Sequence, residues 1–84
     1  MKEIAYSREA AKTLARMPRN LADRIRGKIG DYAADPASQA NNVARLHGLD
    51  GILRLRVGDW RVLFRDEDRI RVINVAPRGG AYRE

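Results

Sequence analysis

The chain of 84 residues contains no cysteine and a single histidine. Without cysteine, disulfide bonds and thiolate chemistry are excluded. His47 and the scattered acidic residues offer no cluster with the spacing of metal ligands. We therefore expect no metal and no other cofactor.

Long apolar runs are also missing. Nowhere does the sequence approach the ~20 consecutive apolar residues that a membrane-spanning helix needs, and Met1–Tyr6 holds no long apolar run either. A chain of this length builds one domain and little more. These features predict a single domain over residues 1–84 and a cytoplasmic location.

Positive charge, in contrast, is plentiful. Lys and Arg total 17 against 11 for Asp and Glu, which gives a formal net charge of +6. Such a balance favours association with nucleic acid or with an acidic protein. Arg far outnumbers Lys, and the planar guanidinium group can bind two phosphate oxygens at once.

The most informative segment is residues 53–65, LRLRVGDWRVLFR, which alternates apolar and charged side chains around a central turn. Alternation of this kind is typical of strands with one buried face. A two-residue loop that begins with Gly58 suits a type II′ hairpin turn. The resulting register pairs Val57 with Trp60, Arg56 with Arg61, Leu55 with Val62 and Leu53 with Phe64.

The hairpin therefore has one apolar and one cationic face. The apolar face carries Trp60 as a core residue, and the cationic face carries Arg54, Arg56, Arg61 and Arg65. Like charges directly opposite one another destabilise a sheet, so the Arg56–Arg61 pair favours an anionic ligand as compensation. The alternative is a solvated charged face, because arginine is usually exposed. The residues alone leave both interpretations open.

The flanking segments predict an α+β fold. We expect a strand over residues 2–6 and two helices, the first capped by Ser7 and the second by Asn20, with Gly27 and Gly30 allowing close helix packing. A polar connection over 37–43, the hairpin, an acidic turn and a strand over 70–76 follow. The order is β-α-α-β-β-β, a small antiparallel sheet with two N-terminal helices on one face. A loop at Glu67–Asp68 would set Arg61 opposite Asn74 and place Asn74, Ala76 and Arg78 on the cationic face.

Three motifs carry a family resemblance: Leu46-His47-Gly48, the hairpin 53–64, and residues 75–83, VAPRGGAYR. Together they resemble the RelE/ParE superfamily of bacterial type II toxins over nearly the whole chain. Similarity to the RelE branch implies a ribosome-dependent endoribonuclease that cuts messenger RNA and is held inactive by a cognate antitoxin, an acidic, partly disordered partner. The ParE branch implies a poison of DNA gyrase instead, and a catalytically weak antitoxin-binding relative is a third alternative.

The resemblance also implies site residues. The catalytic set comprises Arg61 at the scissile phosphate, Arg78 near the leaving oxygen, Arg54 for phosphate positioning, and Tyr82 to stack on a base or orient the phosphate. Further contacts with RNA are assigned to Arg56, Arg65 and Arg83. In this chemistry the ribose 2′-hydroxyl attacks the adjacent phosphate, and no metal is required in principle. A general base is missing, because Arg54 and Ile52 stand where cleaving relatives have lysines.

Two further surfaces follow from the helices. The first helix, with Lys12 and Arg16 beside small residues, is predicted to accept the antitoxin within residues 8–30 and so to form a toxin–antitoxin hetero-oligomer. Alternatively, the helical arginines contact ribosomal RNA, which would make the affinity salt-dependent. These arginines are Arg16, Arg19, Arg24 and Arg26.

Overall fold

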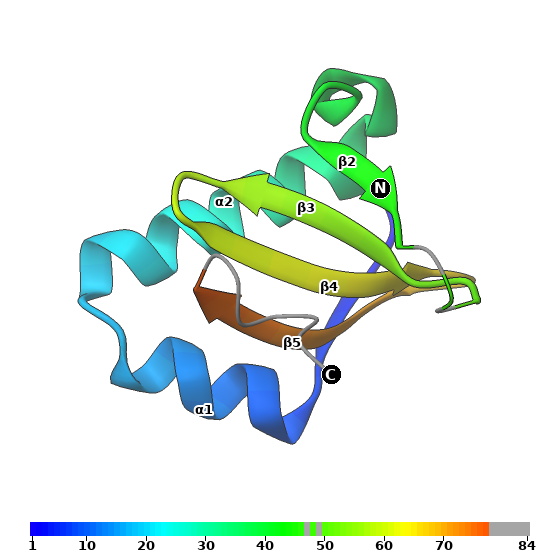
Figure 1. Cartoon of the computed structure of the whole chain (residues 1–84). Helices are drawn as coiled ribbons and strands as arrows, with labels where there is room; N and C mark the ends of the chain where they lie inside the picture. Colours follow the sequence, from blue (N-terminus) through cyan, green and yellow to red (C-terminus); the bar gives the residue numbers. More distant parts are fainter. Residues whose placement is uncertain (47, 49, 78–84) are drawn as a thin grey trace.

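The computed structural model describes residues 1–46, 48 and 50–77 (Figure 1). These residues form two α-helices, one 3-10 helix and a five-stranded sheet with the strand order β1-β5-β4-β3-β2. In chain order the elements are β1 (Ile4–Tyr6), α1 (Arg8–Arg16), α2 (Arg19–Ala34), the 3-10 helix η1 (Pro36–Gln39), β2 (Val43–Arg45), β3 (Leu53–Val57), β4 (Trp60–Asp66) and β5 (Ile70–Pro77). The predicted α+β class is confirmed.

The helix ends follow local side-chain chemistry. Ser7 caps α1 as predicted, because its Oγ accepts a hydrogen bond of 3.0 Å from the backbone nitrogen of Ala10. The predicted cap at Asn20 is wrong: α2 begins at Arg19, and Pro18, two residues before Asn20, holds the cap position without a side-chain hydrogen bond. Proline suits this place because it has no N–H that needs a partner. The α2 helix ends at Asp35–Pro36 as predicted.

The β3–β4 hairpin has the predicted register in every pair. Gly58 has a φ of +58°, and no described residue other than glycine has a positive φ, which fits a turn that needs Gly in its first position only. The pairing sets every hairpin side chain on a defined face. Arg54, Arg56 and Arg61 consequently point to one side of the sheet, and Leu55 and Val62 to the other.

Two features of the sheet differ from the prediction. The sheet is mixed rather than antiparallel, since β1 runs parallel to β5. The predicted polar connection over 37–43 overlaps the 3-10 helix η1, and its last residue, Val43, begins the strand β2, where it pairs with Leu55 of β3. A strand of three residues has too little alternation to be recognised in the sequence, and its pairing with β3 supplies the missing stabilisation.

The pairing of β4 with β5 also differs. Arg61 lies opposite Ala76, not Asn74, because the turn covers residues 67–69 and a bulge shifts the register between Leu63 and Phe64. Ile73 is the extra residue, and its carbonyl accepts a hydrogen bond from the Ser7 hydroxyl. The longer turn and the bulge together shift the register by two residues. Asn74 and Ala76 therefore still share a face with Arg61, as predicted.

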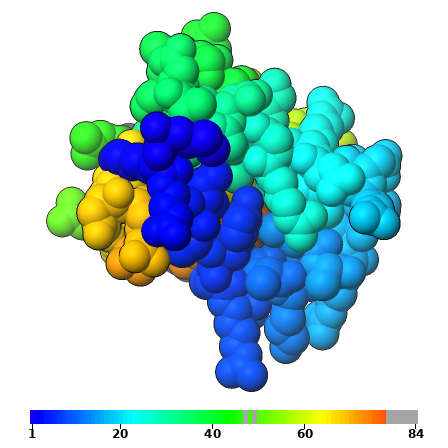
Figure 2. All heavy atoms as spheres, turned by 180° about the vertical axis from the view of Figure 1, so that it is seen from behind, coloured from blue at the N-terminus to red at the C-terminus, as the bar shows by residue number. Residues whose placement is uncertain are grey.

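The core lies between the sheet and the helices, where α1 packs against β5 and α2 against β3. Seen from behind, the N-terminal half of the chain covers most of the molecule (Figure 2). Phe64 is completely buried and meets the Tyr32 ring edge to face, with centroids 4.9 Å apart. Gly27 and Gly30 have open space where a Cβ would stand, so the prediction that they permit close helix packing is wrong. No helix among the described residues is long and apolar enough to cross a membrane.

A polar network links α2 to the end of β4. The Tyr32 hydroxyl donates a 2.7 Å hydrogen bond to the Asp66 carboxylate, which also pairs with Lys2. Burial alone would raise the pKa of Asp66, but the hydrogen bonds from Lys2 and Tyr32 and the Lys2 charge outweigh it and lower that pKa. Burial and the neighbouring carboxylate raise the pKa of Tyr32 to about 12. The network therefore favours a charged Asp66 and a neutral Tyr32.

We predict that Asp66→Asn lowers the free energy of unfolding at pH 7 and that this deficit becomes smaller in acid. A carboxyl group whose pKa is lower in the folded state contributes stability above its unfolded pKa, near 3.9, and loses it as the pH falls through the folded pKa. Urea unfolding at pH 7 and at pH 3 measures the two differences. An equal deficit at both pH values would contradict the prediction.

Candidate functional site

The sheet face opposite the helices carries a group of arginines, Arg54, Arg56 and Arg61, which we call the arginine cluster. Arg56 pairs directly with Arg61 across β3 and β4, and Arg54 lies diagonally from Arg61, opposite Leu63. Such positions have Cβ atoms about 4.5–5.5 Å apart when directly opposite and about 7–8 Å apart along the diagonal. The hairpin register therefore places three arginines at neighbouring positions on one face of the sheet.

Arg61 is the buried member of the cluster, with 6% of its surface exposed. Its Nη1 donates to the Trp60 carbonyl at 3.2 Å and, at the limit of hydrogen bonding, to the Gly58 carbonyl at 3.5 Å. These contacts tie the guanidinium to the tip of the hairpin. The side chain is consequently held in place before any ligand arrives.

Two donors in the cluster are unsatisfied. The Nε atoms of Arg54 and Arg61 are buried and find no hydrogen-bond partner in the described part of the chain. A buried donor without an acceptor costs about 1–3 kcal/mol, and native structures hold few of them. Phosphate oxygens are suitable acceptors for both groups.

No acidic side chain in the described part of the chain neutralises the cluster. Within residues 1–46, 48 and 50–77, the acidic partners found in ion pairs bind Lys2, Arg26, Arg69 and Arg71, and no ion pair includes the cluster. Its positive charge is therefore available to an external anion. The same described residues bring together no group of three or more His, Asp or Glu side chains that would hold a metal ion.

Arg65 lies on the same face but outside the cluster. It stands four residues after Arg61, or roughly 13 Å along the strand. Its Nη1 donates to the Asp50 carbonyl at 3.2 Å and lies 2.7 Å from the position that a Cβ of Gly51 would take. The Arg65 side chain therefore packs on the loop that precedes β3. The structure thus separates this predicted RNA-binding residue from the others.

Leu63 is a part of the site that the sequence reasoning missed. It is 6% exposed, yet it belongs to the arginine side of the sheet and not to the core cluster beneath the helices. It lies opposite half-buried Asn74 of β5, and Ala76, also half-buried, lies opposite Arg61 on the same face. The alternation that placed Arg61 on this face also places Leu63 there and could have found it.

Four residues singled out in the sequence lie outside the described residues. They are His47, Arg78, Tyr82 and Arg83. The roles assigned to Arg78, Tyr82 and Arg83 therefore stay predictions.

Residues 4–82 match the sequence model of the family described as ParE toxin of type II toxin-antitoxin system, parDE. The chain belongs to this toxin family. The match covers nearly the full sequence, including the hairpin and both helices, so the resemblance to the RelE/ParE superfamily is confirmed. Among curated proteins, no sequence matches the toxin.

Solved structures show that the toxin shares its fold with RelE proteins. The archaeal RelE–RelB complex from Pyrococcus horikoshii OT3 contains a chain with a TM-score of 0.77 and 22% identity, covering 95% of the toxin and 98% of that chain. The intact E. coli RelBE toxin–antitoxin complex gives 0.76 and 16%, with coverage of 99% and 100%. The isolated E. coli RelE toxin gives 0.76 and 13%, with coverage of 100% and 88%.

We predict that Arg56→Thr stabilises the free toxin at low ionic strength by about 0.2–1 kcal/mol, because it removes a like-charge pair from the sheet. Added salt screens the repulsion and should reduce this gain. Urea unfolding at about 10 mM and 500 mM NaCl measures both values, conditions that span the screening range. Arg45→Thr is the matched control, since exposed Arg45 lies opposite uncharged Leu53. A gain that is equal for both variants, or independent of salt, would contradict the prediction.

Proposed function

We propose that the toxin is a ribosome-dependent endoribonuclease that cuts messenger RNA, with the scissile phosphate held by the arginine cluster. The observation that carries this proposal is the pair of buried Nε atoms of Arg54 and Arg61, for which the described residues supply neither a hydrogen-bond acceptor nor a carboxylate in an ion pair. An RNA phosphate would supply both the negative charge and the missing acceptors. The fold shared with RelE proteins supports the same choice.

In the proposed reaction the ribose 2′-oxygen attacks the adjacent phosphorus and the bond from phosphorus to the 5′-oxygen breaks. The 2′-hydroxyl loses its proton and the 5′-oxygen gains one, which leaves a 2′,3′-cyclic phosphate and a 5′-hydroxyl. Arg61, already fixed by the Trp60 carbonyl, stabilises the charge that develops on the phosphoryl oxygens. Arg54 and Arg56 hold the phosphate so that the attacking and leaving oxygens are in line.

Proton transfer is not assigned to the cluster. A guanidinium group stays protonated at ordinary pH, so none of the three arginines can act as a general base. We propose that the proton acceptor comes from the ribosome, which makes the dependence on the ribosome part of the mechanism. Arg78 would neutralise charge at the leaving oxygen and Tyr82 would stack on a base, while Arg65 and Arg83 contact the RNA backbone.

The partner that silences the toxin is proposed to be a cognate antitoxin. Two of the similar structures are complexes of RelE with RelB, described as toxin–antitoxin and RelE–RelB complexes. A toxin with a net charge of +6 favours an acidic partner, and a partly disordered one can fold around it on binding. We place this interaction, and the messenger RNA target, in the cytoplasm.

Inhibition of DNA gyrase is the second candidate function. It is favoured by the family match, which is to ParE toxins. In that case the arginine cluster serves binding and not cleavage. No new RNA ends would then form, and DNA supercoiling by gyrase would fall.

We predict that Arg61→Ala lowers the rate of messenger RNA cleavage on translating ribosomes by about 100–1000-fold, the usual effect of removing one donor that stabilises developing negative charge. Arg61→Lys should restore only part of the rate, because an ammonium group cannot bind two oxygens in the fork geometry of arginine. Mapping of RNA 5′ ends gives the rates. A parallel supercoiling assay tests the gyrase alternative.

Arg69→Ala is the matched control for this experiment. It removes the same charge from Arg69, which pairs with Glu3 at 3.8 Å. Arg69 lies in the turn between β4 and β5, at the opposite end of β4 from Arg61. Cleavage by Arg69→Ala should stay within about threefold of the parent toxin, as for a surface change that loses only long-range attraction. Cleavage by Arg61→Ala at the parent rate, with the fold intact by circular dichroism, would refute the proposed role.

A further inference from the structure

Two further arginines face one another on the side of the sheet that carries the arginine cluster. Arg65 of β4 lies directly opposite Arg71 of β5, and we call them the second arginine pair. Their strand neighbours Phe64 and Val72 are buried in the core beneath the helices, so both arginine side chains leave the sheet on the other side. The pair lies four residues along β4 from Arg61, or roughly 13 Å.

Arginines recur along this side of the sheet between the cluster and the second arginine pair. Arg56 lies opposite Arg61. Two residues further along β4, Arg54 lies opposite Leu63, and after another two residues β4 reaches the second pair. A stacked nucleic-acid strand carries one phosphate per about 3.4 Å of its axis, so the whole span corresponds to about four stacked nucleotides, or to fewer in an extended strand. A strand laid along β4 would therefore bring phosphates to both groups.

Both members of the second pair keep donors for a phosphate. An arginine has five N–H donors in a rigid fork. Arg65 uses Nη1 for the Asp50 carbonyl at 3.2 Å, and Arg71 meets the Glu67 carboxylate through Nε at 3.3 Å. The described residues supply no hydrogen bond or ion pair to the other guanidinium nitrogens of these two side chains. Those nitrogens can accordingly bind the oxygens of an external anion.

Glu67 stands where such an anion would bind. Its carboxylate forms the one ion pair found for the second arginine pair within the described residues. The Glu67 and Arg71 side chains are 48% and 50% exposed, and Glu67 belongs to the turn between β4 and β5. An exposed ion pair of this kind contributes little to stability, so a phosphate can replace the carboxylate at small cost.

We infer that the second arginine pair binds a backbone phosphate of the RNA substrate, and that Glu67 takes the place of this phosphate in the free toxin. The inference rests on the proposed function in naming RNA as the ligand, and it adds a subsite several nucleotides away from the scissile phosphate. Continuity with the cluster selects RNA, because a polymer with a charge on every unit reaches both groups at once. The bound phosphate would also offset the repulsion between the facing arginines.

Binding of 2′-O-methyl oligoribonucleotides to the free toxin tests the subsite, because they carry the phosphates but lack the attacking hydroxyl. At about 50 mM salt, Arg71→Gln should weaken the Kd for an octanucleotide by about three- to tenfold. It should also reduce the slope of log Kd against log salt concentration by about 0.7, the value for one phosphate contact in a single strand. A dinucleotide has one phosphate, which the cluster takes, so its Kd should change by less than about twofold.

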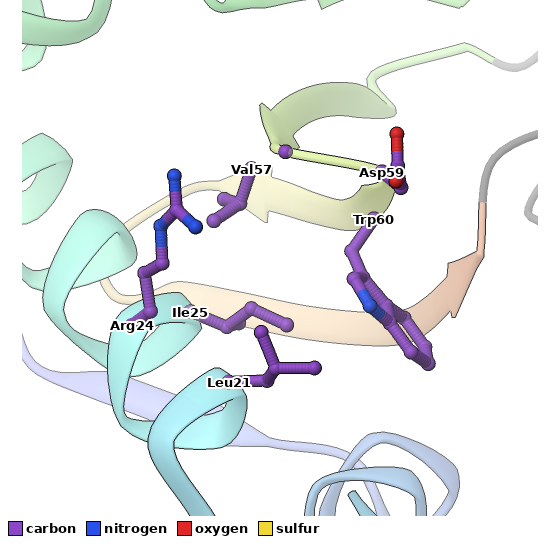
Figure 3. Close-up of a pocket in the computed structure, with 7 residues that line it drawn as sticks. Leu21, Arg24, Ile25, Val57, Asp59 and Trp60 are labelled. Carbon is purple, nitrogen blue, oxygen red and sulfur yellow. The ribbon is translucent and has the colours of Figure 1, made fainter. Parts of the chain in front are cut away.

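Arg24→Gln is the matched control for the lost charge. Arg24 lies on the helix side of the sheet, where it lines a groove between α2 and the hairpin tip together with Leu21 and Trp60 (Figure 3). The control removes the same charge from the opposite side of the sheet. It should weaken the Kd for the octanucleotide by less than about twofold, because only long-range attraction is lost.

The role of Glu67 has its own variant. Glu67→Gln should tighten the Kd for the octanucleotide by about two- to fivefold, since it removes the competing carboxylate. In the Arg71→Gln background the same change should have a smaller effect, because the group for which Glu67 competes is gone. Asp23→Asn is the matched control on α2: it removes the carboxylate that pairs with Arg26 at 3.6 Å and should leave the Kd within about twofold.

Several results would overturn the inference. One is the absence of saturable octanucleotide binding by the parent toxin at low salt. Others are equal losses for Arg71→Gln and Arg24→Gln, equal losses for the octanucleotide and the dinucleotide, or a Glu67→Gln effect that persists in full without Arg71. If Arg71→Gln weakens binding of an oligoglutamate of the same net charge by as much as it weakens the octanucleotide, the pair does not select RNA. Circular dichroism of each variant confirms the fold.

The two proposals fail separately. If the octanucleotide binds as expected but the toxin makes no RNA ends on ribosomes, the subsite stands and the endoribonuclease proposal falls. If the toxin cuts messenger RNA but Arg71→Gln binds the octanucleotide as tightly as the parent toxin does, the subsite falls alone.

Discussion

The covering of one sheet face by α1 and α2 is the constraint on which the site depends. Leu55, Val62 and Phe64 are completely buried beneath the helices, and strand geometry then sends their neighbours to the other side. A shift of one residue in the β3–β4 pairing would expose the core and bury charge at the same time. The position of the arginine cluster is therefore fixed by the energetics of the core, although none of its members belongs to that core.

The cluster itself is locally unfavourable. Arg56 faces Arg61, and two buried Nε atoms lack acceptors among the described residues. Ordinary sheet stabilisation would place an opposite charge or an uncharged side chain at one of these positions. Unfavourable contacts that the surrounding fold tolerates are typical of binding and catalytic sites, where the ligand removes the cost. The free toxin thus has more to gain from an anion than a solvated arginine surface would.

The sequence predicted the parts of the fold that local rules determine. The hairpin register, the Ser7 cap and the end of α2 follow from alternation, side-chain capping and proline, and all three are confirmed. The parallel partner of β1 and the short strand β2 depend on pairing between distant segments, which no local pattern encodes. For the site, alternation placed Arg54, Arg56 and Arg61 together, but it could not show that Arg65 turns to the Asp50 carbonyl or that Arg61 is buried.

The bulge at Ile73 divides β5 into two halves, and each half pairs with β4 in a different register. From Ile70 to Val72 the register is set by the acidic turn. After the bulge, Val75 and its neighbours pair in the second register, which includes the partner of Arg61. Changes in the length of that turn can consequently be absorbed at the unpaired residue before they reach the arginine side of the strand. Asn74 and Ala76 would then keep their places beside the cluster.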